Sequence, residues 1–175
     1  MDNLNAVFDK TIDRRAAAKI LGLENSNHIA VWIGRKYLVP AQIDPAGGTR
    51  RQFRFSFVNV VEMAILRELN DSFHLEYSLG SRILGELFGP SGERLTSVIQ
   101  DGKGIIVIAK NYRSTKKPLS RPDITSNECK ILKKDDDFEV KFLKNSLNIG
   151  EIAENSDYTM TINLKKVIER LKKEF

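Results

Sequence analysis

Apolar residues recur at helical spacing in two short segments near the start of the chain, and a glycine separates them. The first segment, Ile12–Leu21, has alanines and aliphatic residues on one side and basic residues on the other. Gly22 can adopt the left-handed conformation that ends a helix, and the short stretch after it allows only a sharp turn into a second helix. Asn25, Ser26 and Asn27 all have side chains that accept from free N–H groups at a helix start, so we expect one of them to cap this second helix.

The second helix is predicted to have one buried and one exposed face. Ile29, Trp32 and Ile33 lie at positions i, i+3 and i+4 and form the apolar face. Pro40 prevents the helix from continuing past Val39. The opposite face carries small, amide and basic side chains: Asn27, Ala30, Val31 and Arg35.

A basic hairpin and a strongly apolar helix are predicted next. The segment Gln42–Phe55 has turn-forming residues from Asp44 to Gly48, followed by arginines that alternate with phenylalanines. Ser56 and Asn59 resemble a helix cap, and the run after them is apolar nearly all round, so we expect this third helix in the core. The order helix, turn, helix, hairpin, helix is that of a winged helix-turn-helix, which we assign to residues 1–72. Residues 1–10 either add a short helix packed on this domain or form a loose tail.

The second half of the chain, residues 73–175, predicts a small antiparallel sheet with helices. Helical spacing extends over Leu75–Phe88 and again over Glu93–Ile99, and Ile105–Ala109 has the composition of a buried strand. Residues 110–128 are polar and are expected to form an exposed loop. The later elements are a hairpin of Cys129–Lys133 with Phe138–Leu143, then a strand from Tyr158 that passes directly into a helix at Leu164. The fold class expected for the whole chain is therefore α+β.

Charge is concentrated in the first part of the chain. Between Lys10 and Phe55 there are nine Lys or Arg and three Asp or Glu, whereas residues 71–175 carry 18 basic and 16 acidic side chains. The single cysteine, Cys129, excludes an intramolecular disulfide, and no leader resembling a signal peptide opens the chain, so we expect a cytoplasmic location. The longest apolar stretch, Ile105–Ala109, is too short to cross a bilayer, and no membrane partner is expected.

The basic winged unit predicts binding to double-stranded DNA, with the second helix in the major groove and the hairpin along the phosphates. The residues expected to face bases are Asn27, Ala30, Val31 and Arg35, because small, amide and guanidinium groups suit base edges and thymine methyls. The residues expected to contact phosphates are Arg14, Lys36, Arg50, Arg51 and Arg54. Arg15, Asn25 and Ser26 complete the predicted DNA-binding surface.

The stretch from Thr11 to about Leu69 resembles the DNA-binding domain of the MerR family of transcriptional regulators. The matching features are Leu21-Gly22-Leu23 at the end of helix one, Trp32, Leu38-Val39-Pro40 after helix two, and Arg54-Phe55-Ser56 before helix three. The resemblance implies a homodimeric regulator of transcription. The chain departs from the family pattern at Ala30-Val31, where an arginine and an aromatic are usual, and at Lys36, where glycine is usual. The helix after Leu164 is also too short for the coiled coil through which family members commonly dimerise.

Other functions have less support in the sequence. A second hypothesis is a protein-interaction adaptor that uses the winged surface to bind an acidic partner protein. The second half either binds a small effector or supplies the dimer interface. His28 and His74 are far apart and have no carboxylate or thiol set at ligand spacing, so we expect no metal site and no cofactor. We find no nucleophile with a visible catalytic partner, which argues against an enzyme.

Overall fold

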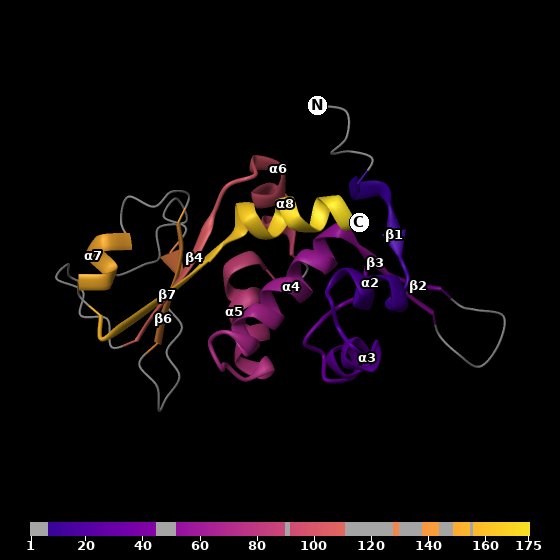
Figure 1. Ribbon diagram of the computed structural model, residues 1–175, viewed down its shortest axis with the longest axis horizontal. Helices are drawn as coiled ribbons and strands as arrows, with labels where there is room; N and C mark the ends of the chain where they lie inside the picture. The colour runs from indigo at the N-terminus through magenta and orange to yellow at the C-terminus, as the bar shows by residue number, and fades with distance from the viewer. Residues whose placement is uncertain are drawn as a thin grey trace.

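The structure is a computed structural model and describes residues 7–44, 52–89, 92–110, 128–129, 138–143, 149–154 and 156–175. It has a mixed α+β architecture with two small antiparallel sheets. Figure 1 shows one sheet with α2 and α3 at the right, the other sheet with α7 at the left, and α4 and α5 between them. In the described part of the chain no helix is long and apolar enough to span a membrane.

The first half of the chain contains the helices α2 to α4 and the short strands of one sheet. These elements are β1 (Thr11–Ile12), α2 (Arg14–Ile20), α3 (Asn27–Gly34), β2 (Gln42–Asp44), β3 (Gln52–Ser56) and α4 (Phe57–Asp71). The sheet has the order β1-β3-β2. Residues 7–9 are also helical, and Val7 and Phe8 pack against the core, as the first alternative for the N-terminal segment predicted.

Helix α2 starts later than the sequence predicts. Ile12 is not helical: it lies in β1, pairs with Phe55 of β3 and is buried. Helix α2 begins after Asp13, whose side chain accepts from the backbone N–H of Ala16 at 2.8 Å. The prediction of a helix from Ile12 is therefore wrong at its first residues, because the cap at Asp13 fixes the start and the strand pairing buries Ile12.

The turn between α2 and α3 is held from inside the molecule. Gly22 has a φ of +64°, and the N–H of Leu23 donates to the carbonyl of Ala18 at 2.9 Å, as expected for a glycine that ends a helix. Arg67 of α4 donates through its guanidinium to the carbonyl of Leu21. The Arg67 Nε atom also lies 2.8 Å from the carboxylate of Asp71. This bridge fixes α4 against the C-terminal end of α2.

Helix α4 begins with the cap that the sequence predicts, and α3 does so only in part. Ser26 is the N-cap residue of α3 and its side chain makes no capping hydrogen bond. Asn25 Oδ1 accepts instead from the N–H of Asn27 at 2.8 Å, one residue before the usual capping position. Ser56 and Asn59 form a reciprocal capping box at the start of α4. Most of α4 is buried, which confirms that this helix belongs to the core.

The second half of the chain contains the larger sheet and the remaining helices. Its elements are α5 (Tyr77–Phe88), α6 (Glu93–Asp101), β4 (Ile105–Lys110), β5 (Glu128–Cys129), β6 (Phe138–Leu143), α7 (Ile149–Glu154), β7 (Tyr158–Asn163) and α8 (Leu164–Glu174). The predicted helices α5 and α6, the buried strand β4 and the direct passage from β7 into α8 are confirmed. The sequence did not predict α7. The loop expected at residues 110–128 is wrong at its two ends, because Lys110 lies in β4 and Glu128 in β5. Of the expected hairpin, Cys129 pairs with Val140 of β6, and the turn at residues 134–137 lies outside the described residues, as does the rest of the loop.

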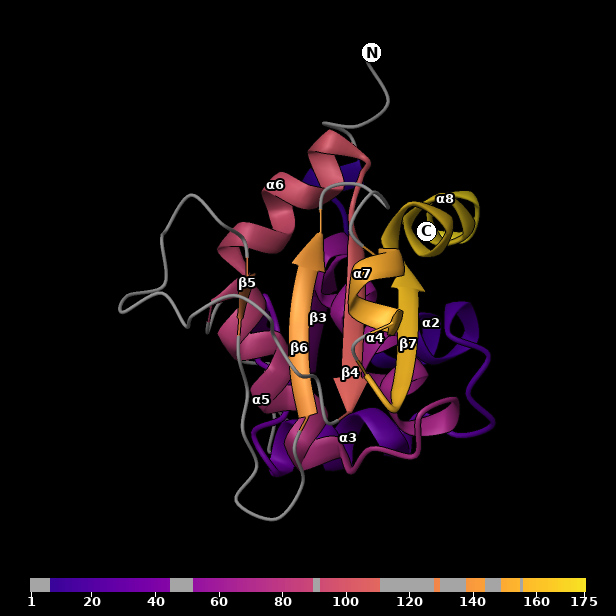
Figure 2. The same ribbon diagram turned by 90° about the vertical axis from the view of Figure 1, so that its left-hand side faces the viewer.

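Strand β4 is apolar from Ile105 to Ala109 because both of its faces are covered. The sheet order is β5-β6-β4-β7, with every neighbouring pair antiparallel. Ile106 and Ile108 belong to the main core, which includes α4 and α5. Val107 and Ala109 point to the other face and pack with Ile152 of α7. Figure 2 shows α7 in front of the sheet and α4 and α5 behind it.

Helix α8 joins the two halves of the molecule. Its buried residues Leu164, Ile168 and Leu171 belong to the same apolar cluster as the core of the first half. The ring of Phe175 packs edge-on against Phe57 of α4, with ring centroids 5.2 Å apart. This cluster crosses the predicted domain boundary between residues 72 and 73, and the division into two domains stays a prediction.

Candidate nucleic-acid interface

Helix α3 presents a polar side while its apolar side holds it in place. Ile29 and Trp32 are 0% and 2% exposed, and the indole of Trp32 contacts the ring of Tyr77 on α5 at a centroid distance of 5.4 Å. Asn27, Val31 and Arg35 lie four residues apart along the helix and its end, and all three are exposed. Ala30 is half-buried beside them, Ser26 is also half-buried, and Asn25 is exposed.

Four basic side chains in and after the two short helices are not engaged with acidic groups. Arg14 is half-buried at the start of α2, Arg15 follows it and is exposed, and Arg35 and Lys36 are exposed at the end of α3. Within the described residues none of the four forms an ion pair. Their charges are therefore available to an external anion. Two further predicted phosphate contacts, Arg50 and Arg51, lie outside the described residues.

Arg54 differs from these four because it already has a carboxylate partner. Its Nε atom lies 3.1 Å from Asp44 Oδ2, across the pair of strands β2 and β3. Asp44 also accepts from Gln42 Nε2 at 2.6 Å. A phosphate would have to compete with Asp44 for the guanidinium, so Arg54 is a weaker candidate contact than the sequence alone suggests.

A buried amide ties the segment after α3 to the core. Asn59 of α4 is 7% exposed, and its Nδ2 atom donates to the carbonyl of Val39 and to Glu62 Oε2, each at 3.0 Å. Burial raises the pKa of the Glu62 carboxyl, and the hydrogen bond from Asn59 partly offsets this effect. The sequence identified Asn59 as a cap but gave no sign of its bond to Val39, which joins residues 20 positions apart.

Three aliphatic side chains in α3 and in the segment that follows it are exposed. Val31 on α3, Val39 in the link that follows and Ile43 on β2 are 49%, 65% and 50% exposed. The predicted contact of Val31 with a thymine methyl requires an exposed side chain, and the contact itself stays a prediction. Val39 and Ile43 were not among the predicted contacts, and exposed aliphatic side chains of this size are suited to a macromolecular surface.

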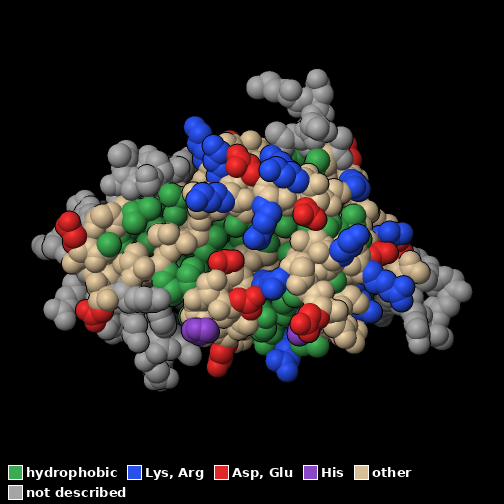
Figure 3. Space-filling view, viewed as in Figure 1, with side chains coloured by type: hydrophobic (Ala, Val, Ile, Leu, Met, Phe, Trp, Pro, Cys, Tyr) green, Lys and Arg blue, Asp and Glu red, His purple; other side chains and the backbone are tan. Residues whose placement is uncertain are grey.

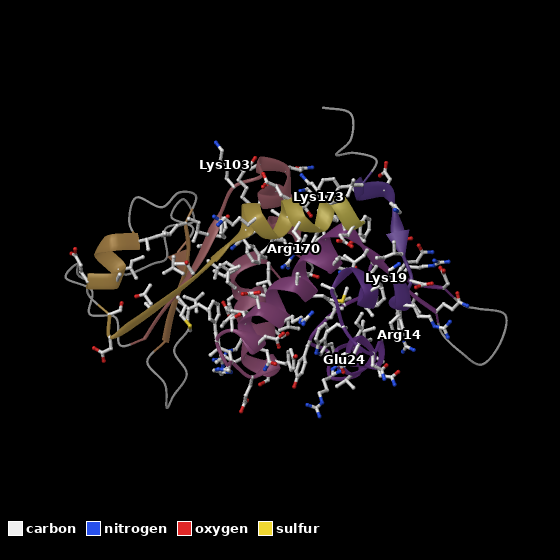
Figure 4. All side chains as sticks on the ribbon, viewed as in Figure 1. Arg14, Lys19, Glu24, Lys103, Arg170 and Lys173 are labelled. Atoms are coloured by element: carbon white, nitrogen blue, oxygen red, sulfur yellow. The ribbon has the colours of Figure 1, made fainter. Side chains whose placement is uncertain are left out.

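A second group of cations lies on α8. Lys166, Arg170 and Lys173 are exposed at positions i, i+4 and i+7, and in the described part of the chain they form no ion pairs. Figure 3 shows Lys and Arg side chains over α8 and α2 with acidic side chains between them. Figure 4 labels Arg14 and Lys19 on α2, Arg170 and Lys173 on α8, and Lys103 before β4. In Figures 1 and 2, α8 lies in the upper part of the molecule and α3 at the bottom, so the α8 row is separate from α3.

Among the described residues, no three His, Cys, Asp or Glu side chains come together in a way that would hold a metal ion. His28 and His74 are both exposed. No protein-family model matches the chain, and no curated protein sequence matches it either.

Proposed function

We propose that this protein is a sequence-specific DNA-binding regulator of transcription, with a winged helix-turn-helix formed by α2, α3, the β2–β3 hairpin and α4. The observation that carries the proposal is the arrangement of α3. Ile29 and Trp32 fix the helix from its buried side, while Asn27, Val31 and Arg35 follow its exposed side. A rigid helix with such an exposed side suits insertion into a major groove.

Each exposed group of α3 has a matching feature on a base pair. A guanidinium such as that of Arg35 can donate two hydrogen bonds to guanine, and an amide such as that of Asn27 can pair with adenine. Val31 offers an apolar contact for a thymine methyl. Phosphate contacts are assigned to unpaired cations, since neutralising phosphates supplies most of the sequence-independent affinity. Among the described residues these cations are Arg14, Arg15 and Lys36. Arg50 and Arg51 are proposed as phosphate contacts from the sequence alone.

The proposal is tested by the salt dependence of duplex binding in two variants with equal loss of charge. One variant replaces Arg14, Arg15 and Lys36 with alanine, and the matched control replaces Lys166, Arg170 and Lys173 on α8. The first variant should lower the slope of log affinity against log salt by roughly 2–3 units, since each lost phosphate contact removes about 0.9. The α8 control should keep the slope of the unchanged protein.

Two results would count against DNA binding at α3. One is an absence of binding to any duplex recovered by selection from random DNA. The other is an equal loss of slope in both variants, which indicates attraction to polyanions without a defined site. A further variant separates base recognition from phosphate contact. Arg35→Ala should reduce the discrimination between bases at one or two base pairs by about 1–3 kcal/mol. In contrast, joint replacement of Arg50 and Arg51 should weaken all duplexes alike.

A second candidate function is an adaptor that binds an acidic partner protein through the same surface. The exposed side chains of Val39 and Ile43 favour it, because they follow Lys36 closely in the chain and add exposed apolar area to that segment. If the protein is an adaptor, it should retain a partner protein from nuclease-treated lysate and should not bind duplex DNA. The variant Val39→Asp should then lose that partner. Duplex binding that persists in purified protein favours the first proposal.

A further inference from the structure

Strand β7 forms one edge of the larger sheet. All six of its residues pair with β4 in an unbroken register, from Tyr158 opposite Lys110 to Asn163 opposite Ile105. Among the described residues no strand pairs with its other side. Figure 2 shows β7 as the outermost strand, with its arrow leading towards α8. The described strands therefore leave the backbone groups on that outer side unpaired.

The edge lacks the features that usually prevent strands from pairing across it. Natural proteins protect exposed edges with charged residues, proline, bulges or very short strands. The sequence of β7, Tyr-Thr-Met-Thr-Ile-Asn, contains no charged residue, no proline and no glycine. Its register with β4 has no bulge. Six uncharged residues with β-forming side chains make a template for strand addition.

The structure also fixes which residues of β7 face outwards. Just beyond the strand, the N–H of Leu164 donates to the carbonyl of Gly104 at 3.0 Å, towards the β4 side. In an antiparallel ladder the backbone groups of alternate residues point to the same neighbour. The backbone groups of Ile162, Met160 and Tyr158, counted back from Leu164 in steps of two, therefore bond to β4. The N–H and C=O groups of Thr159 and Thr161 and the N–H of Asn163 point to the free side, while the C=O of Asn163 belongs to the first turn of α8, because Asn163 is the N-cap of that helix.

The pattern of polar and apolar residues is symmetric about Thr161. Apolar Met160 and Ile162 flank it, polar Thr159 and Asn163 come next, and apolar Tyr158 and Leu164 follow. An antiparallel copy with its two-fold axis at Thr161 would therefore place polar residues opposite polar residues and apolar residues opposite apolar ones. It would also use the outward-facing N–H and C=O groups of this strand in both copies.

We propose that the outer edge of β7 is the dimer interface of this protein, and that it pairs antiparallel with β7 of a second copy. In this register Thr161 lies opposite Thr161 of the partner subunit, and the two residues exchange both backbone hydrogen bonds. Met160 lies opposite Ile162 of the partner subunit on the face that carries the main core. The two larger sheets become one continuous sheet. This proposal stands independently of DNA binding.

The first test is Thr161→Pro, measured by sedimentation velocity over a dilution series. Proline removes the N–H that points outwards, and it leaves the β4 ladder intact because Thr161 does not bond to β4 through its backbone. We expect the unchanged protein to be a dimer and Thr161→Pro to be a monomer with the same far-UV circular dichroism. A monomeric unchanged protein overturns the proposal, and so does a Thr161→Pro variant that remains a dimer.

The second test reads the register and does not depend on the proline variant. In a Cys129→Ser background, a thiol cross-linker with a very short span should join two copies of Thr161→Cys, whose Cα atoms would be about 5.5 Å apart. Thr159→Cys is the matched control, because its own copy would be displaced by four residues, about 13 Å along the strands. Cross-linking of Thr161→Cys alone supports the proposed pairing. Equal cross-linking of both variants, or of neither, overturns it.

Discussion

Lys36 has a backbone conformation that favours glycine. Its φ is +59°, in the left-handed region that costs residues with a Cβ atom about 1–2 kcal/mol. We predict that Lys36→Gly raises the free energy of unfolding by about 0.5–1 kcal/mol, since relief of this strain exceeds the added flexibility of the unfolded chain. Urea denaturation of the purified variant measures the change.

Lys36→Ala is the control for this prediction, because alanine removes the charge and keeps the Cβ atom. It should leave stability unchanged or slightly lower it. If the proposed phosphate contact is correct, both variants should lose duplex affinity by the same factor. A gain in stability for Lys36→Ala as large as that for Lys36→Gly would show that charge repulsion, and not the backbone, limits stability here.

Glu62 gives a second prediction at this scale, through the pH dependence of stability. Its carboxyl pKa is raised in the folded protein by burial, despite the hydrogen bond from Asn59. The folded state therefore binds more protons than the unfolded state between the ordinary glutamate pKa and the raised one, and stability falls as pH rises through that window. Glu62→Gln should have a higher melting temperature than the unchanged protein at neutral pH. The difference should shrink on acidification; a difference that is constant with pH would contradict the assignment to Glu62.

At the scale of elements, the position of α2 against α4 depends on Arg67. Its guanidinium donates to the carbonyl of Leu21 and contacts Asp71. Arg67→Met keeps much of the aliphatic stem but leaves that carbonyl without its donor, and we predict a loss of about 1–3 kcal/mol in thermal or urea unfolding. Asp71→Asn removes only a partly exposed ion pair and should cost less than about 1 kcal/mol. Equal losses in the two variants would show that Arg67 stabilises the fold through its ion pair with Asp71 and not through its hydrogen bond to the carbonyl of Leu21.

Local patterns in the sequence were sufficient for most elements of the fold. The cap at Ser56, the run Ile105–Ala109 and the change from alternation to helical spacing at Leu164 each lie within a few residues, and all three are confirmed. The start of α2 was misplaced because Ile12 fits a helical pattern, yet it pairs with Phe55, 43 positions further along the chain. The short helix α7 was missed because its apolar residues are explained only by the sheet face that they cover.

The candidate site was predictable only in part, for the same reason. The exposed side of α3 follows from helical spacing, which depends on the sequence alone. The pairing of Arg54 with Asp44 depends on the register of β2 and β3, and the bond from Asn59 to Val39 depends on the packing of α4. Neither interaction leaves a periodic signal, so both required the three-dimensional structure.

At the scale of the whole molecule, the continuous core bears on how the chain unfolds. Helix α8 belongs to the second half of the sequence, yet Leu164, Ile168 and Leu171 share the apolar cluster that contains Trp32 and the core of α4. Two regions that share buried surface lose it together, so neither should keep its stability when the other unfolds. We therefore expect a single cooperative transition, although the sequence predicts two domains.

Ile168→Ala tests this expectation. Ile168 is 1% exposed, and its truncation should remove about 2–4 kcal/mol of stability through lost burial and a residual cavity. Trp32 is the single tryptophan and lies in the first half of the chain, so its fluorescence reports on that half, while far-UV circular dichroism reports on all helices and strands. Both signals should move to the same lower urea midpoint, whereas Lys166→Ala on the exposed side of α8 should move neither by more than about 0.5 kcal/mol. An unchanged fluorescence midpoint beside a shifted circular dichroism midpoint would instead establish two separately folding domains, divided as the sequence predicts near residue 72.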